Sequence, residues 1–183
     1  MNRNVWFSRQ FGDTSSFALR VSLSSGPRGE IAWGALELWA AGLCLTRATH
    51  HEDGTTTDAV EGDLGEVFSW FARAGVRLVN EEPLPLLTPR TVTDASDWFN
   101  ETEECFDAAD ERAWFARRSE WRNSHGLRRA SLAIALPNVA FRRAGDELEI
   151  SWDNETWGTS HPGLRYTELR GAVTVAARPV AEV

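Results

Sequence analysis

Apolar and polar residues alternate along several short stretches of the chain, which is the pattern of strands with one face against a core. In the first of these, Phe17, Leu19, Val21 and Leu23 alternate with polar or small residues. The sequence predicts strands at residues 17–24, 32–40, 43–49, 138–143, 147–153 and 171–177.

Two hairpins are predicted from the turns between these strands. Ala144-Gly145-Asp146 separates the strands of the stretch from His125 to Asp153, and Ala41-Gly42 separates 32–40 from 43–49. Glycine supplies the backbone freedom that tight turns need. We expect the strand 147–153, which follows the Ala144-Gly145-Asp146 turn, to face a core with Leu148, Ile150 and Trp152 and to face water with its other side.

Helical spacing appears in two longer segments. Val60, Leu64, Val67, Phe68 and Phe71 lie three and four residues apart, so a helix over 58–79 is predicted to face the sheet with one stripe. Asp58 or Thr57 is expected to cap this helix, and Gly75 to end its main part. A broken helical pattern over 94–133 predicts two or three further helices.

These elements predict an α+β fold, an antiparallel sheet of about five or six strands with the helices of 58–79 and 94–133 packed on one face. The 183 residues are expected to form a single domain. Pro179 and the apolar spacing of Val180 and Val183 resemble the first turn of a helix, which is too short to be stable alone. We therefore expect the chain to continue or to be completed by a partner.

A shortened helix at this end would leave part of the last strand uncovered, and contiguous exposed apolar surface marks interaction sites. The sequence thus predicts self-association, or docking of a partner helix, around residues 171–183. The candidate interface residues are Val173, Val175, Val180 and Val183.

The charge composition narrows the functional classes. The net charge is −8, which disfavours global attraction to nucleic acid or to an anionic membrane. All 19 basic residues are arginine, so Schiff-base lysines and phosphate-loop lysines are excluded. Cys44 and Cys105 lie far apart without metal-binding spacing, which is typical of free thiols in a reducing cytosol. No signal peptide or membrane-length apolar run is present, so a cytoplasmic location is expected.

Residues capable of binding a metal gather at one loop. His50, His51, Glu52 and Asp53 are adjacent, and His161 is a distant candidate ligand. Zinc sites draw three or four ligands from more than one element, so adjacent residues favour a solvated loop over a metal site. No metal and no cofactor is expected.

Arginines dominate residues 112–143, which contain eight Arg and one acidic residue, Glu120, for a local charge of +7. Trp114, Phe115 and Trp121 lie among them, as a surface that stacks on single-stranded bases would require. The alternative is pairing with the acidic residues at 101–111. The candidate nucleic-acid or phosphate ligands are Arg117, Arg118, Arg122, Arg128 and Arg129.

His125 could form an acid–base pair with Glu120 or Asp153, but no Ser or Cys nucleophile with a recognisable signature lies beside it. A capping or packing role for His125 is the alternative. Trp152 and Trp157 could line a small-molecule pocket, or pack in and around the core. The sequence therefore gives no catalytic residue.

Three stretches together resemble a known family region. They are GALELWAAGLCLTR (Gly34–Arg47), DLGEVFSWFARAGVRLVNEEPLP (Asp63–Pro85) and the unit from His125 to Asp153 that contains LPNVAFRRAGDELEISWD. They resemble the region that precedes ImmA/IrrE-type zinc metallopeptidase domains in bacterial stress or defence proteins. The resemblance implies a further helix after the last strand. The peptidase motif H-E-x-x-H is absent from this sequence.

Three functional hypotheses follow. The resemblance and the missing catalytic signature favour a non-catalytic protein-interaction or sensor/regulatory domain of a bacterial stress or defence protein, for which control of a metallopeptidase is one expected role. The first alternative is nucleic-acid binding through residues 112–143. The second is a metal-dependent hydrolase that uses His50, His51, Asp53 and His161.

Overall fold

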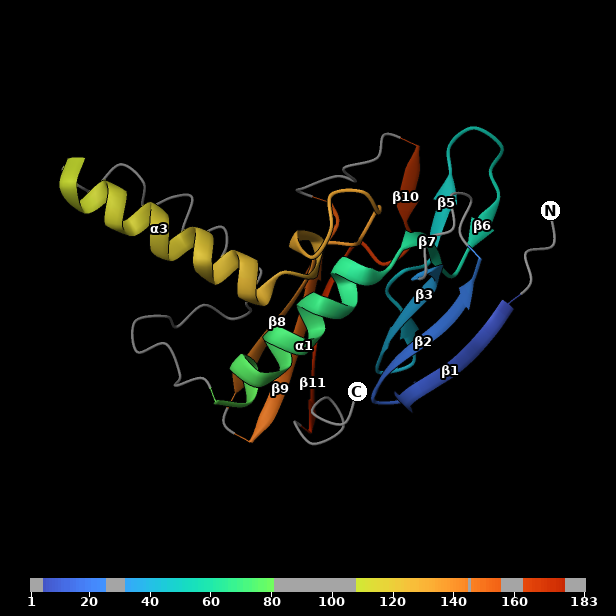
Figure 1. The fold of residues 1–183 in the computed structure, drawn as a ribbon, viewed down its shortest axis with the longest axis horizontal. Helices are drawn as coiled ribbons and strands as arrows, with labels where there is room; N and C mark the ends of the chain where they lie inside the picture. The colour runs from blue at the N-terminus through green and yellow to red at the C-terminus, as the bar shows by residue number, and fades with distance from the viewer. Residues whose placement is uncertain (1–4, 26–31, 81–107, 145, 156–162, 177–183) are drawn as a thin grey trace.

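The structure is a computed structural model that describes residues 5–25, 32–80, 108–144, 146–155 and 163–176 (Figure 1). The described residues form three antiparallel sheets and two α-helices, which confirms the α+β class. The strands divide among three sheets, however, where the sequence predicted one. The predicted strand 43–49 is itself split between two of these sheets.

The five-stranded sheet runs in the order β1-β2-β3-β4, and β7 also pairs with β3. Its strands are β1 (Val5–Asp13), β2 (Phe17–Ser24), β3 (Trp33–Ala40), β4 (Leu43–Cys44) and β7 (Val60–Asp63). The predicted strands 17–24 and 32–40 are confirmed. β1 was not predicted, because Val-Trp-Phe at its start breaks the alternation.

The turn between β3 and β4 has the predicted form. Ala41 and Gly42 both have positive φ, 48° and 81°, as a two-residue hairpin turn of this hand requires. The strand after the turn is much shorter than predicted. Thr46 ends it, because its hydroxyl accepts the hydrogen bond of the Leu38 amide at 3.0 Å, where a longer strand would offer a backbone carbonyl.

Residues 45–47 of the predicted strand 43–49 lie outside any strand, and its last two residues belong to a different sheet. This three-stranded sheet has the order β10-β5-β6 and consists of β10 (Leu164–Tyr166), β5 (Ala48–His50) and β6 (Thr56–Thr57). β10 and β6 were not predicted, because two or three residues are too few to show a period. Tyr166 anchors β10, since its buried hydroxyl donates to the Ala135 carbonyl at 2.5 Å.

The third sheet has the order β11-β9-β8 and confirms the predicted hairpin. Its strands are β8 (Val139–Ala144), β9 (Glu147–Asp153) and β11 (Arg170–Ala176). One expectation was wrong: β9 is buried on both faces. Glu149 and Ser151, on the face that was expected to meet water, are buried, and so is Asp153 at the strand end. Arg142 bridges to Glu149, and Arg170 lies 3.8 Å from Asp153.

Helix α1 (Gly65–Asn80) begins later than predicted. Residues 60–63 of the predicted helix form β7, in which buried Val60 and Gly62 alternate with exposed Glu61 and Asp63. The Asp63 carboxylate accepts the Gly65 amide at 3.0 Å and so marks the helix start in place of Asp58. Gly75 lies within the helix and does not end it.

Helix α3 (Ala108–His125) and the short 3-10 helix η2 (Leu127–Arg129) replace the predicted helices of 94–133. Residues 94–107 lie outside the described part of the chain. The helix ends at His125, eight residues before the predicted end, and 130–138 has no regular structure. Figure 1 shows the first turns of α3 extending away from the sheets.

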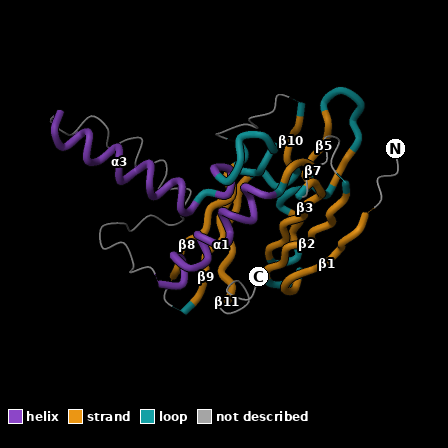
Figure 2. Tube along the Cα trace, in the orientation of Figure 1, coloured by secondary structure: helices purple, strands orange, loops and turns teal. Residues whose placement is uncertain are grey.

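The core joins the first and third sheets through aromatic residues. Phe141 of β8 lies edge to face against Phe17 of β2, with ring centroids 6.0 Å apart. Trp70 and Phe71 of α1 also contact Phe141, at 5.8 and 6.2 Å. Figure 2 shows α1 alongside β8 and β9, with the five-stranded sheet next to it. One apolar cluster therefore stabilises both sheets and α1.

In the part of the chain that the structure describes, neither helix combines the length and the apolar character required to cross a membrane.

Candidate interaction edge

Strand β1 forms the outer edge of the five-stranded sheet. Among the described strands it pairs only with β2, and its nine residues are exposed or half-buried along their whole length. Trp6 is 57% exposed and Val5 equally so. Figure 1 shows no other described element beyond β1 on this side of the sheet.

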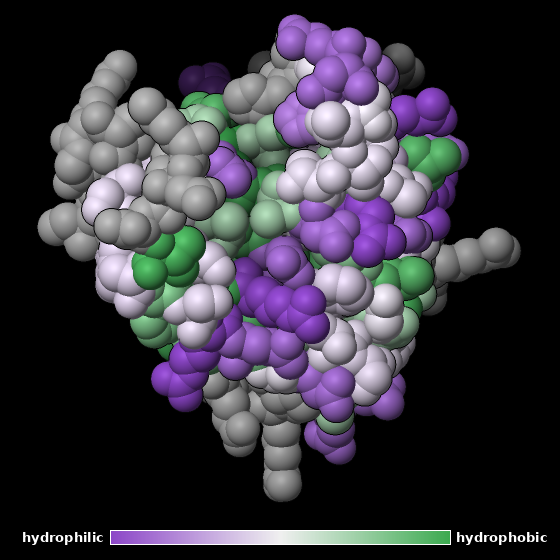
Figure 3. Space-filling model, turned by 90° about the vertical axis from the view of Figure 1, so that its right-hand side faces the viewer, coloured by the Kyte–Doolittle hydropathy of each residue, from purple (hydrophilic) through white to green (hydrophobic). Residues whose placement is uncertain are grey.

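The two faces of β1 differ in chemistry. Phe11 packs against the core, and the guanidinium of Arg9 lies over the Phe11 ring, 5.1 Å from its centroid. Ser8 and Gln10, which alternate with Arg9 and Phe11 in sequence, face the other side, where they contact Ser22 and Arg20 of β2. Figure 3, viewed from this side of the molecule, shows hydrophilic and hydrophobic residues interspersed rather than one apolar patch.

A polar network on this outer face holds β1 in place. Arg20 of β2 donates to the Gln10 amide oxygen at 2.7 Å and to Glu37 of β3 at 3.3 Å. Its guanidinium also lies over the Trp39 ring at 4.9 Å, and Trp39 donates to Glu37 at 2.8 Å. The hydroxyls of Ser8 and Ser22 are 3.1 Å apart. Side chains of three strands thus fix β1 before any partner binds.

The far end of β1 is fixed by its turn. The Asp13 carboxylate accepts hydrogen bonds from the amide and the hydroxyl of Ser15, both at 2.9 Å. These bonds hold the pKa of Asp13 below its ordinary value, so the group is ionised at neutral pH. The turn between β1 and β2 is also hydrogen-bonded to the turn between β3 and β4, because the Gly42 amide donates to the Thr14 carbonyl at 2.7 Å.

An edge strand presents a row of backbone donors and acceptors to any strand that approaches it. Proteins usually block such edges with Lys, Pro, bulges or very short strands. β1 contains no Lys and no Pro; its register shift lies at its start, between Val5 and Phe7, and Gly12 near its end has a positive φ of 80°. The arrangement can therefore accept a further strand by backbone hydrogen bonding, with Trp6 beside it as an apolar contact.

The metal candidates that the structure describes lie at one turn and do not form a metal site. His50 ends β5, and His51 and Asp53 lie in the turn that follows, with Asp53 accepting from the Thr55 amide and hydroxyl at 2.9 and 2.7 Å. These two bonds hold the pKa of Asp53 below its ordinary value. No group of three metal-binding side chains occurs within the described ranges, and His161 lies outside them.

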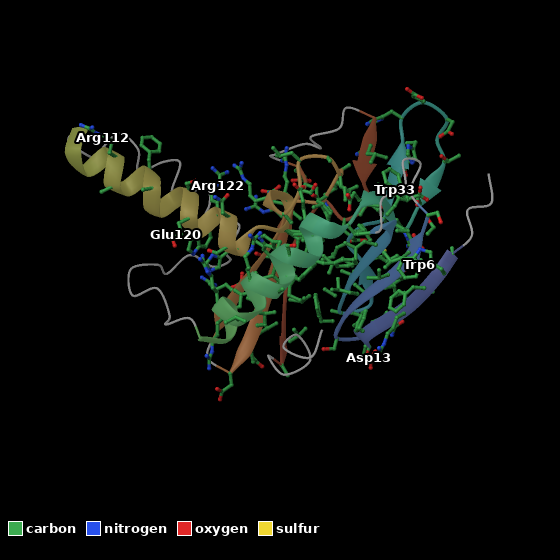
Figure 4. All side chains as sticks on the ribbon, in the orientation of Figure 1. Trp6, Asp13, Trp33, Arg112, Glu120 and Arg122 are labelled. Atoms are coloured by element: carbon green, nitrogen blue, oxygen red, sulfur yellow. The ribbon has the colours of Figure 1, made fainter. Side chains whose placement is uncertain are left out.

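The arginine candidates are spread over two elements. Arg122 belongs to α3, whereas Arg128 and Arg129 form the end of η2. Burial, followed by the neighbouring Arg129, lowers the pKa of Arg128. Figure 4 shows Arg112 at the opposite end of α3 from Arg122. Arg117 and Arg118 lie in α3, but their side chains fall outside the described set.

The remaining candidates occupy structural positions. His125 is buried, stacks on Trp121 with centroids 4.6 Å apart, and has its Nδ1 2.7 Å from the Trp121 carbonyl. The carboxylate of Glu120 lies 3.8 Å from Arg77 of α1. Trp152 is buried, as the packing alternative for it predicted, and Trp157 lies outside the described residues.

The C-terminal interface candidates are only partly visible. Val175 belongs to the core and Val173 packs against it, so the apolar face of β11 is covered by the same chain. Val180 and Val183 lie outside the described residues. The described part of this region therefore lacks the exposed valines that the predicted interface needed.

Comparison with protein-family models, with curated proteins and with solved structures found no match for this chain.

Proposed function

We propose that the chain is a non-catalytic protein-interaction module that binds a partner by strand addition at β1. The observation that carries this proposal is the exposed nine-residue edge, which the side chains of β2 and β3 hold in an extended form. Preorganisation of this kind lowers the entropic cost of binding.

The biological setting of this module is also part of the proposal. Resemblance to the region that precedes ImmA/IrrE-type peptidases supports a regulatory role in a cytoplasmic bacterial stress or defence protein. The sequence has no H-E-x-x-H motif, so any peptidase activity belongs to another segment or another chain. On this account the module recruits or controls the peptidase and takes no part in its chemistry.

Affinity capture with paired variants tests the proposal. Trp6→Lys combined with Ser8→Lys places two charges on the β1 edge, the device by which natural edges resist pairing. Leu132→Lys is the matched control, because Leu132 is 88% exposed and lies in the 130–138 segment, outside the five-stranded sheet. We expect the edge variant to lose proteins that the wild type and the control retain. Equal capture by all three would contradict the proposal.

Arg128 and Arg129 favour a second candidate function, nucleic-acid binding. Two adjacent arginines at the end of η2, one of them partly desolvated, are suited to phosphate contacts. We expect such binding to weaken steeply as salt rises. Fluorescence anisotropy with single- and double-stranded oligonucleotides tests it: unchanged binding after Arg128→Ala and Arg129→Ala would exclude this surface.

A further inference from the structure

We propose that the strand added at β1 is the β1 strand of a second copy of this chain, in an antiparallel pair about a two-fold axis. This inference rests on the proposed function, because it takes the β1 edge as the binding surface. The inference identifies the partner as a second copy because the charges of the β1 edge complement one another when two such edges pair.

Symmetry limits the registers of such a pair. In an antiparallel pair about a two-fold axis, residues equally far from the axis on the two strands face one another. Of the axes through Arg9, Gln10 and Phe11, the first places two Arg9 side chains opposite each other, and like charges in this position repel. The second places Asp13 opposite Phe7, without a counter-charge.

The axis through Phe11 gives complementary charges. It places Arg9 of each copy opposite Asp13 of the other, so two ion pairs form across the joint. Gln10 then faces Gly12, which offers no side chain to obstruct it. The two Phe11 rings meet at the axis and extend the apolar contact between the sheets.

Arg9 and Asp13 are both accessible and held in position for these ion pairs. Arg9 and Asp13 are exposed, and within the described residues no acidic side chain pairs with Arg9. Phe11 positions the Arg9 guanidinium beside the proposed axis. The Ser15 amide and hydroxyl fix the Asp13 carboxylate at the strand end and keep it ionised. Among the residues that the structure describes, neither side chain has an ion pair to break in order to dimerise.

Pairing of short strands buries little surface, so the association should be weak and concentration-dependent. Sedimentation velocity between about 1 and about 500 µM covers the corresponding range of dissociation constants. We expect a monomer–dimer equilibrium at low salt that shifts toward monomer at about 0.5 M salt, because exposed charges are then screened.

Charge exchange tests the register. Arg9→Asp alone and Asp13→Arg alone each place like charges opposite one another, and each should raise the dissociation constant at least about tenfold. The double variant Arg9→Asp with Asp13→Arg restores opposite charges and should return the constant to within about threefold of the wild type. A strictly monomeric wild type, or a double variant no tighter than either single variant, would overturn the proposal.

Asp13→Arg also removes the hydrogen bonds to Ser15, so this variant alone does not separate loss of the ion pair from misfolding of the turn. A second variant at Asp13 makes that distinction. Asp13→Asn keeps the acceptor oxygen and loses the charge, and should weaken dimerisation while thermal unfolding stays close to that of the wild type. A dimer unaffected by Asp13→Asn would count against the ion pair.

The two proposals can fail separately. If the wild type is monomeric but the edge variant still loses captured proteins, self-pairing is wrong and the proposed function stands. If charge exchange controls a dimer and no captured protein depends on the edge, self-pairing stands and binding to other proteins at β1 is wrong.

Discussion

The buried hydroxyl of Thr46 connects three segments of the chain. The hydroxyl oxygen accepts a hydrogen bond from the Leu38 amide at 3.0 Å, the hydroxyl O–H donates to the Asp58 carbonyl at 2.7 Å, and the residue is fully buried. Thr46→Val keeps the shape of the side chain but leaves both backbone groups without this partner. We expect it to lower the free energy of unfolding by about 1–3 kcal/mol.

Urea unfolding measures this change, and Thr46→Ser is the matched control. Serine keeps the hydroxyl and loses one buried methyl, so its cost should be close to the ~1 kcal/mol of a single methylene. A valine variant as stable as the serine variant would show that the hydroxyl does not stabilise this junction.

The ion pair between Arg47 and Asp58 should make stability depend on pH. Arg47 Nε lies 2.6 Å from Asp58 Oδ1, and this hydrogen bond is the main cause of the lowered pKa of Asp58. Because the folded pKa lies below the unfolded value of 3.8, the contribution is complete above that value and is lost as the pH falls through the folded pKa. Both side chains are 43% exposed, so the contribution at neutral pH should be under about 1 kcal/mol.

Asp58→Asn removes this contribution and is measured by thermal unfolding between about pH 7 and about pH 2. We expect the variant to be less stable than the wild type at neutral pH, and the two to converge under acidic conditions. A difference that persists unchanged to the lowest pH would show that charge is not its cause.

At the scale of elements, a helical and a strand glycine should respond oppositely to the same substitution. Gly75 lies inside α1, and apart from the helix's own backbone no atom of the described residues would lie within 4 Å of an added Cβ, so Gly75→Ala should stabilise the protein by about 0.5–1 kcal/mol. Gly171 of β11 faces Trp152 of β9, and an added Cβ would lie 2.4 Å from the indole Cζ2.

Gly171→Ala must displace the Trp152 ring or the strand, at a cost of about 1–3 kcal/mol. Chemical unfolding of the two variants side by side measures both effects. Stabilisation by Gly171→Ala would mean that the indole does not lie across this glycine.

Strands and helices long enough to show several repeats of their apolar–polar pattern could be predicted from the sequence. The β8–β9 hairpin is an example, with Phe141 and Ile150 paired across it. The segment after Asp58 was predicted as helix because Val60 and Leu64 fit a helical stripe. Pairing of Val60 with Leu36 of β3 makes it a strand instead. That preference comes from a tertiary contact, which a local period cannot show.

At the scale of the whole molecule, the proposed edge at β1 lies at the other end of the sequence from the interface predicted at residues 171–183, which stays a prediction because Val180 and Val183 lie outside the described residues. Val173 and Val175 of β11 were expected at an uncovered surface, whereas Val175 belongs to the core cluster and Val173 packs against it, through tertiary contacts that the sequence does not show. β1 was overlooked because its apolar residues run consecutively from Val5 to Phe7. An edge strand has few partners to impose alternation, so its sequence is the least diagnostic of all the strands.

Hydrogen–deuterium exchange at about 1 and about 500 µM protein tests most directly whether β1 is the interaction edge. Backbone amides that point away from β2 should exchange rapidly in dilute protein and slow down when a second strand pairs with them. We predict slower exchange in the concentrated sample, confined to peptides from Val5–Asp13 and the turn that follows. Slowing confined to Arg170–Ala176 or to α3, or exchange that does not change with concentration, would contradict the account.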